Sequence, residues 1–220
     1  MFRTGNSFID SFSEILAFAP LLPVFVILFR RIFHEDIFNY LTTVCLLDFI
    51  RRLTIRISQP NLTKLIPLIH VFSLMEFIFL VLAFRTILRK GSREMVNVLA
   101  IALISAVITH DIIKGIGQNS YWLDLLQHAF IVILAGYCLV RSVKKENLQI
   151  LYSALFWIST GTLFYFSTIL LVEMLSGCFA SWRSSSFRDS ELLLDFASLA
   201  RYFFYLLAAL LYKSRENSLE

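Results

Sequence analysis

Charged residues are scarce in this sequence. They make up 16% of the 220 residues and fall in short runs between long apolar segments, whereas soluble proteins contain about 25%. Hydrophobic residues make up 58%, and the mean hydropathy is +0.73. This composition excludes an ordinary water-soluble domain and is typical of a protein that lies in a lipid bilayer.

Cysteines and long polar stretches are also few. The three cysteines are an odd number, and Cys45 and Cys138 fall in apolar segments at different depths, so no disulfide framework is predicted. The connections between the apolar segments are too short for a soluble domain, and we expect a single domain over residues 1–220. The stretch 1–18 lacks the basic region and small-residue cleavage site of a secretory signal, so the first helix is expected to be retained.

Seven apolar stretches are long enough to cross a membrane as helices, since a span needs roughly 20 mostly apolar residues. The predicted helices lie near residues 12–29, 37–56, 64–88, 94–113, 121–141, 148–176 and 191–213. We therefore predict an all-α polytopic membrane protein, a bundle of seven transmembrane helices. Pro20 and Pro23 are expected to bend the first of these helices.

Lysine and arginine are unevenly divided between the two ends of the predicted helices. Ten of the twenty follow the first, third, fifth and seventh helices, six lie at the opposite ends, and four lie within spans. Because cytoplasmic loops are enriched in basic residues, this bias predicts an N-terminus outside and a cytoplasmic C-terminus. The net charge of +4 arises largely at these helix ends, so no nucleic-acid partner is expected.

Ionisable residues inside the predicted spans gather in the outer half of the membrane. A charged side chain at the bilayer centre costs at least about 2.5 to 3.5 kcal/mol, so such groups normally face protein or water and pair with one another. We predict an outward-facing polar cavity inside the bundle, with these ligand-binding candidates: Asp48, His70, Glu76, Asp124, His128 and Arg201. The alternative is a purely structural role, such as an ion pair between Glu76 and Arg201.

Two spacings predict local pairs along single helices. Asp48 precedes Arg51 and Arg52 by three and four residues, so the three share a helix face and are expected to form structural ion pairs. Asp124 precedes His128 by four residues, a spacing that would let the carboxylate orient the imidazole.

Three histidines and several carboxylates on one side of the bundle make a zinc site an alternative. No H-E-x-x-H motif occurs, and no two histidines share a helix face at a spacing of four, so the ligands would have to converge from separate helices. We therefore predict no cofactor and keep zinc only as the alternative.

The predicted sixth helix is rich in small and hydroxylated residues. Ser159, Thr160, Gly161 and Thr162 follow one another there. Such residues permit close approach and hydrogen bonds between helices, which predicts a central packing helix. Trp157 and Tyr165 on this helix are candidates for the wall of an apolar ligand pocket, with simple packing as the default interpretation.

Two short patterns resemble a group of membrane proteins. His70 followed by Glu76 and Phe77, together with the stretch FWISTGTLFYFS at residues 156–167, is similar to small uncharacterised seven-helix proteins of the bacterial inner membrane. The resemblance implies that architecture and location, and it supplies no chemistry. Microbial rhodopsins differ, because they carry a lysine for retinal in the middle of the last helix, where this chain has Arg201. No retinal is therefore expected.

Three classes of function remain open from the sequence. The leading hypothesis is a receptor-like sensor that binds a small ligand from the outer side and signals to a cytoplasmic partner protein through its basic loops. An enzyme is less favoured; it would be an intramembrane, metal-dependent or metal-free lipid hydrolase or transferase using His70, Glu76 and His128. A transporter is the third, and the apolar inner half of the bundle argues against a path through it.

Overall fold

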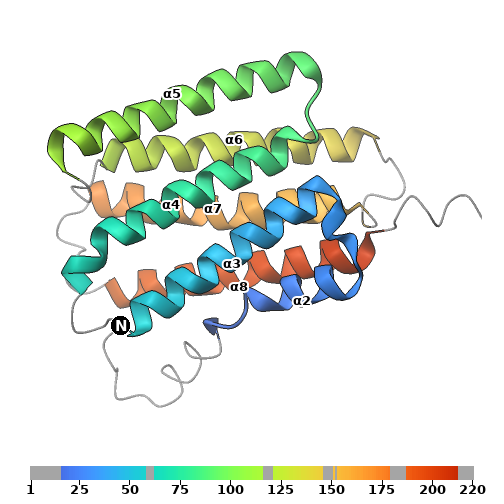
Figure 1. Cartoon of the computed structure of the whole chain (residues 1–220), viewed down its shortest axis with the longest axis horizontal. Helices are drawn as coiled ribbons and strands as arrows, with labels where there is room; N and C mark the ends of the chain where they lie inside the picture. Colours follow the sequence, from blue (N-terminus) through green and yellow to red (C-terminus); the bar gives the residue numbers. More distant parts are fainter. Residues whose placement is uncertain are drawn as a thin grey trace, which may run out of the picture.

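The computed structural model describes residues 16–57, 62–115, 121–145, 151, 153–178 and 187–212. Within these residues the chain forms seven α-helices and one 3-10 turn (Figure 1). In chain order they are α2 (Leu21–Phe29), η1 (Ile32–His34), α3 (Asp36–Ile57), α4 (Leu62–Arg85), α5 (Lys90–Lys114), α6 (Tyr121–Lys145), α7 (Ala154–Cys178) and α8 (Phe187–Leu211). The all-α prediction is confirmed.

Five of these helices are long and apolar enough to cross a membrane. The spanning stretches are Leu65–Arg85, Lys90–Lys114, Trp122–Lys144, Ala154–Leu175 and Leu192–Leu211, which belong to α4 through α8. Helix α2 has only nine residues, and α3 carries Asp48, Arg51, Arg52 and Arg56. The described helices thus support the membrane class and five of the seven predicted spans.

The helix predicted over residues 12–29 is interrupted, as its prolines suggested. Residues 17–20 form turns, and α2 begins at Leu21. Pro20 directly precedes α2, and Pro23 lies in its first turn. At these positions the backbone N–H would have no acceptor within the helix, so its absence in proline costs no helical hydrogen bond. The predicted start near 12 lies outside the described residues, and α7 begins at Ala154, six residues after the predicted start near 148. The other described boundaries agree with the prediction to within four residues.

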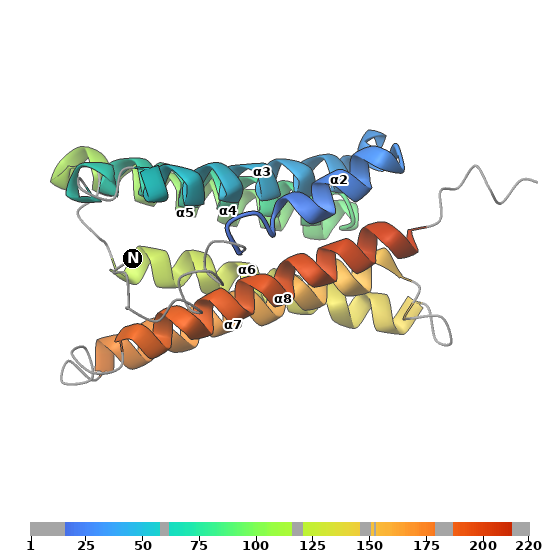
Figure 2. The ribbon, with the colours of Figure 1, turned by 90° about the horizontal axis from the view of Figure 1, so that it is seen from below.

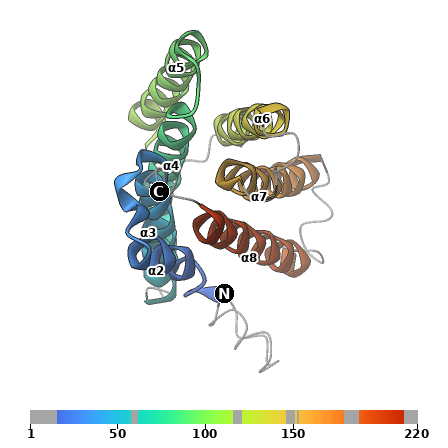
Figure 3. The same ribbon diagram turned by 90° about the vertical axis from the view of Figure 1, so that its right-hand side faces the viewer.

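The helices pack in two layers. Figures 2 and 3 show α2, α3, α4 and α5 side by side in one layer and α6, α7 and α8 in the other. Helix α8 contacts α2, and α6 contacts α4 and α5, so the layers meet along both edges. Between them, large side chains such as Phe84 and Tyr205 are fully buried. Side chains that connect the two layers therefore lie in this buried region between them.

Helices α7 and α8 come unusually close at Gly161. A Cβ atom added there would lie 2.8 Å from Phe204 Cβ and 3.2 Å from the Arg201 carbonyl oxygen. One turn of α7 away, the Trp157 ring stacks on Phe204, with centroids 5.6 Å apart. The hydroxyls of Thr162 and Tyr205 are 2.8 Å apart. The prediction that this stretch of α7 packs closely against another helix is confirmed.

Arginine side chains cap helix ends on the side predicted to be cytoplasmic. Arg30 Nη1 donates to the carbonyl oxygens of Ala209 (2.5 Å) and Leu210 (2.6 Å) at the end of α8. Just beyond α4, Arg141 donates to the carbonyl of Ile87 at 2.6 Å. Arg93 Nε donates to the carbonyl of Arg85, the last residue of α4, at 3.2 Å. The last carbonyls of a helix have no partner within it and carry partial negative charge, so a guanidinium satisfies both needs.

Replacing Arg30 with glutamine is expected to lower the free energy of unfolding by about 1 kcal/mol, the usual size of one hydrogen bond's contribution. The neighbouring Arg31 is also exposed and has no hydrogen bond to α8 among those described, so Arg31→Gln is the matched control. Unfolding by SDS in mixed micelles, followed by far-UV circular dichroism, measures both. Equal losses in the two variants would contradict the capping role.

Candidate functional site

Three helices bring six charged residues together between the layers. Helix α3 contributes Asp48, Arg51 and Arg52, α4 contributes Glu76, and α8 contributes Asp195 and Arg201. We call these six residues the charge cluster. With three arginines and three carboxylates its formal charge is zero. Balance of this kind is what makes burial of ionised groups tolerable, because an uncompensated charge in an apolar interior is very costly.

Arg201 is the centre of the charge cluster. Its side chain is fully buried, and its guanidinium reaches from α8 to both helices opposite: Nη1 donates to Glu76 Oε1, and Nη2 lies 3.5 Å from Asp48 Oδ2. The Tyr165 ring of α7 lies over the guanidinium, with Cζ 3.9 Å from the ring centroid, a cation–π contact. Arg201 therefore ties the second layer to the first.

Tyr202 extends this connection. Its hydroxyl accepts a hydrogen bond from Arg201 Nη2 at 2.7 Å and donates one to Asp48 Oδ2. Within the part of the chain that the structure describes, Arg201 Nε has no hydrogen-bond partner. The guanidinium is thus held at its tip by groups from α3, α4 and α8.

The remaining two arginines surround the buried carboxylates. Arg51 donates to Asp48 Oδ1, and its Nη1 lies 3.5 Å from Glu76 Oε2. Arg52 Nε donates to Asp48 Oδ2 at 2.9 Å, and its Nη2 donates to Ser198 Oγ at 2.7 Å. The pairs predicted along α3 are therefore present, and each arginine also contacts another helix.

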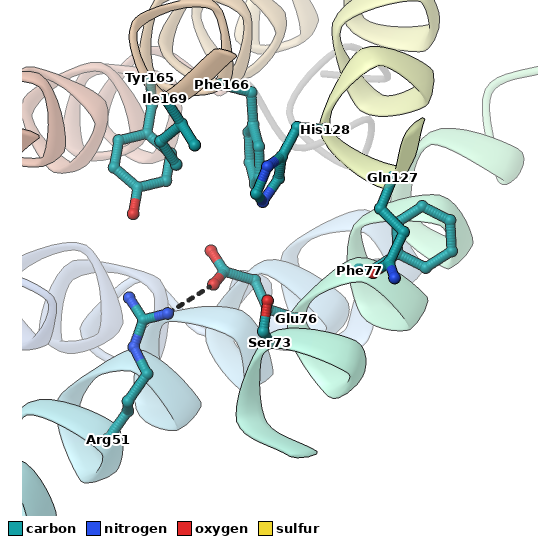
Figure 4. Close-up of a pocket in the computed structure, with 9 residues that line it drawn as sticks. All are labelled: Arg51, Ser73, Glu76, Phe77, Gln127, His128, Tyr165, Phe166 and Ile169. Atoms are coloured by element: carbon teal, nitrogen blue, oxygen red, sulfur yellow. Dashed lines mark hydrogen bonds and ion pairs between the residues drawn. The ribbon is translucent and has the colours of Figure 1, made fainter. Parts of the chain in front are cut away.

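A small cavity adjoins the charge cluster. Its volume is about 30 Å³, and its lining residues come from α3, α4, α6 and α7: Arg51, Ser73, Glu76, Phe77, Gln127, His128, Tyr165, Phe166 and Ile169. Figure 4 shows the Glu76 carboxylate pointing into the space between the layers, with His128 and Tyr165 on the opposite side. A cavity needs about 10 to 15 Å³ of such space to hold a water molecule, so this one has room for one or two. The cavity is therefore suited to a very small polar occupant.

Two histidine–carboxylate pairs join neighbouring helices nearby. His70 Nε2 lies 3.1 Å from Asp111 Oδ2 and links α4 to α5. His128 Nδ1 lies 3.0 Å from Glu173 Oε2 and links α6 to α7. Asp124 interacts electrostatically with both histidines. The imidazole of His128 is therefore oriented across helices by Glu173, whereas the spacing along α6 predicted Asp124 for that role.

The structure brings together most of the residues singled out in the sequence. Asp48, Glu76 and Arg201 meet in the charge cluster, and His128 and Tyr165 line the cavity. His70 does not line the cavity, since its ring is paired with α5. Trp157 is also away from it, stacked on Phe204 and donating to the carbonyl of Leu151 at 2.8 Å.

The sequence analysis missed several residues that shape this site. Ser73 precedes Glu76 by three residues and so shares its helix face, a signal that could have identified it. Gln127 adjoins His128 but carries no pattern of its own. Nothing in the sequence distinguished Tyr202 from the other aromatics, because its role depends on a carboxylate from a distant helix.

A metal centre is not supported by the donor set. Across the described ranges, no three His, Cys, Asp or Glu side chains lie close enough to hold a metal ion. His70 and His110 both contact Asp111, whereas His128 pairs separately with Glu173. The zinc alternative therefore has no ligand set within those ranges.

The fold and the site define an α-helical protein of the membrane class with a buried, balanced charge cluster between two helical layers. No family model, no curated protein and no solved structure matches the chain.

Proposed function

We propose that the protein is a seven-helix sensor of the bacterial inner membrane. It binds a small polar ligand from the outer side at the cavity beside the charge cluster and passes a change in helix packing to a cytoplasmic partner protein. In this arrangement the N-terminus is outside and the C-terminus is cytoplasmic.

The observation that carries this proposal is the position of Arg201. Its fully buried guanidinium joins α8 to α3 and α4, and one of its partners, Glu76, also lines the cavity. A ligand that contacts Glu76 competes directly with the ion pair that connects the two layers. Binding and layer packing therefore share one side chain.

The size of the cavity supports coupling between binding and packing. Ligand pockets usually measure about 300 to 1,000 Å³, and this cavity has about 30 Å³. Any occupant larger than a water molecule or two must displace lining side chains. The ion pair between Arg51 and Glu76 is the looser of the two on Glu76, at 3.5 Å, and is the one we expect to open.

The direction of signalling follows from the two ends of the bundle. The histidine pairs lie toward the ends of α4 to α7 that the sequence predicts to be outside. The opposite ends carry most of the lysines and arginines, which are typical of cytoplasmic loops and offer contact points for a partner. The outer end is thus suited to ligand entry and the inner end to output.

Cysteine accessibility tests this proposal. In a variant lacking the three natural cysteines, Ser73→Cys is expected to react with a charged, membrane-impermeant methanethiosulfonate reagent added to the outer side of right-side-out vesicles. Ser73 lines the cavity, and opening of the Arg51–Glu76 pair admits an occupant larger than water. Ser105→Cys, on an exposed position of α5, is the matched control and is expected to stay unmodified, since a charged reagent does not enter hydrocarbon.

Inside-out vesicles give the opposite comparison. Reaction of Ser73→Cys only from the cytoplasmic side would overturn the outward opening of the cavity. Failure to react from either side would show that polar solutes do not reach the cavity, and the sensor proposal would then fail.

A further inference from the structure

A second concavity lies between α2 and α8, away from the polar cavity. This groove has a volume of about 360 Å³ and is lined by Ala19, Leu22, Phe196, Leu199, Ala200, Tyr202, Phe203 and Leu206. No charged residue is among them. Its size falls within the range of about 300 to 1,000 Å³ typical of ligand sites, so an apolar ligand fits it by volume and by chemistry.

The groove has a buried floor and exposed walls. Ala19 and Tyr202 are buried, and Ala200 is small, which gives the floor its depth. Leu22 from α2 and Phe203 from α8 also line the groove and are each 55% exposed.

The surface around the groove is continuous with the membrane-facing side of α8. Leu193, Phe203 and Leu210 are about half exposed and recur along the same helix. The stretch Leu192–Leu211 that contains them is long and apolar enough to cross a membrane. In a bilayer, the groove therefore opens onto lipid hydrocarbon.

We propose that this groove binds one acyl chain of a bilayer phospholipid. The lining residues of α8 run from Phe196 to Leu206, and the ten steps between these two positions rise about 15 Å at about 1.5 Å each. That length is half of the roughly 30 Å hydrocarbon core, which is the depth of one leaflet.

Tyr202 connects the bound chain to the charge cluster. Its ring lines the groove, its hydroxyl donates to Asp48, and its ring centroid lies 4.9 Å from Arg201 Cζ. An acyl chain in the groove packs against the residue that helps to hold Arg201. The lipid thus supports the charge cluster through Tyr202, a role that does not depend on the small ligand proposed above.

Photolabelling in nanodiscs tests the lipid site. The probe is a phosphatidylcholine with a diazirine on one acyl chain, and the labelled peptides are mapped by mass spectrometry. We expect labelling to concentrate on Leu22 and on residues 196–206, and to fall several-fold in Ala200→Phe, which fills the groove. Ala102→Phe, at an exposed position of α5, makes the same change elsewhere on the lipid-facing surface and should leave the labelling unchanged.

A second measurement does not depend on filling the groove. A benzophenone amino acid placed at the exposed Phe203 is expected to cross-link to phospholipid. Cross-linking to residues 1–15 or to a second copy of the chain would overturn the proposal, because the groove would then have a protein occupant. Labelling spread evenly over all lipid-facing helices and unaffected by Ala200→Phe would overturn it as well.

Discussion

Glu76→Gln is expected to lower the free energy of unfolding by about 3 kcal/mol. The substitution keeps the shape of the side chain but removes the charge that pairs with the fully buried Arg201 and with Arg51. Removing one partner of a buried ion pair leaves a charge without compensation, which typically costs about 3 to 5 kcal/mol. SDS-induced unfolding in mixed micelles measures the loss. Glu94→Gln, at an exposed position of α5, is the control and should change stability by less than about 0.5 kcal/mol.

A double-mutant cycle separates the ion pair from general disruption. Arg201→Gln alone is expected to lower the free energy of unfolding at least as much as Glu76→Gln. It removes the guanidinium that pairs with two carboxylates, those of Asp48 and Glu76. In the double variant both charges are absent, so its loss should be clearly smaller than the sum of the two single losses. Simple additivity would show that Glu76 and Arg201 do not stabilise one another, and the role of the charge cluster in joining the layers would be wrong.

Gly161→Ala and Gly136→Ala are expected to change stability in opposite directions. At Gly161 the new methyl group would meet Phe204 Cβ at 2.8 Å and the Arg201 carbonyl at 3.2 Å, so α7 and α8 must separate. Overpacking of this kind typically costs about 1 to 3 kcal/mol. At Gly136 on α6 the nearest atom is Leu163 Cδ1 at 3.9 Å, an ordinary contact. There the better helix propensity of alanine should add up to about 1 kcal/mol.

The glycine pair also has a local readout. Because the Phe204 ring stacks on Trp157, separation of α7 and α8 should change the environment of this indole. We expect a shift of tryptophan fluorescence in Gly161→Ala and none in Gly136→Ala. If Gly161→Ala stabilises the protein, the close approach of these helices is not maintained in the membrane.

The helices were predictable because their signal is local. Apolar length alone located α4 to α8, and Pro20 marked the interruption before α2. Helix α3 is also predicted as a span, but it is not among the five described helices apolar enough to cross a membrane, because its charged residues lower its hydropathy. Apolarity measured along one segment cannot register the compensation of these charges by neighbouring helices.

The candidate site was predictable only in part, and the reason is physical. The cost of burying charge required Asp48, Glu76 and Arg201 to find partners inside the bundle, and they pair with one another. The choice of partner depends on which helices are neighbours. For this reason the spacing along α6 predicts Asp124 as the partner of His128, whereas the hydrogen bond of His128 is to Glu173 on α7.

The capping arginines affect how membrane topology can be engineered in this chain. Arg30 donates to a backbone carbonyl of α8, Arg93 to one of α4, and Arg141 to one in the turn after α4. Substituting these arginines would weaken the helix ends and also alter the charge bias. A reversed orientation in the membrane could then not be attributed to the charge bias alone. Exposed lysines such as Lys90 and Lys144 are the positions at which the orientation signal can be changed by itself.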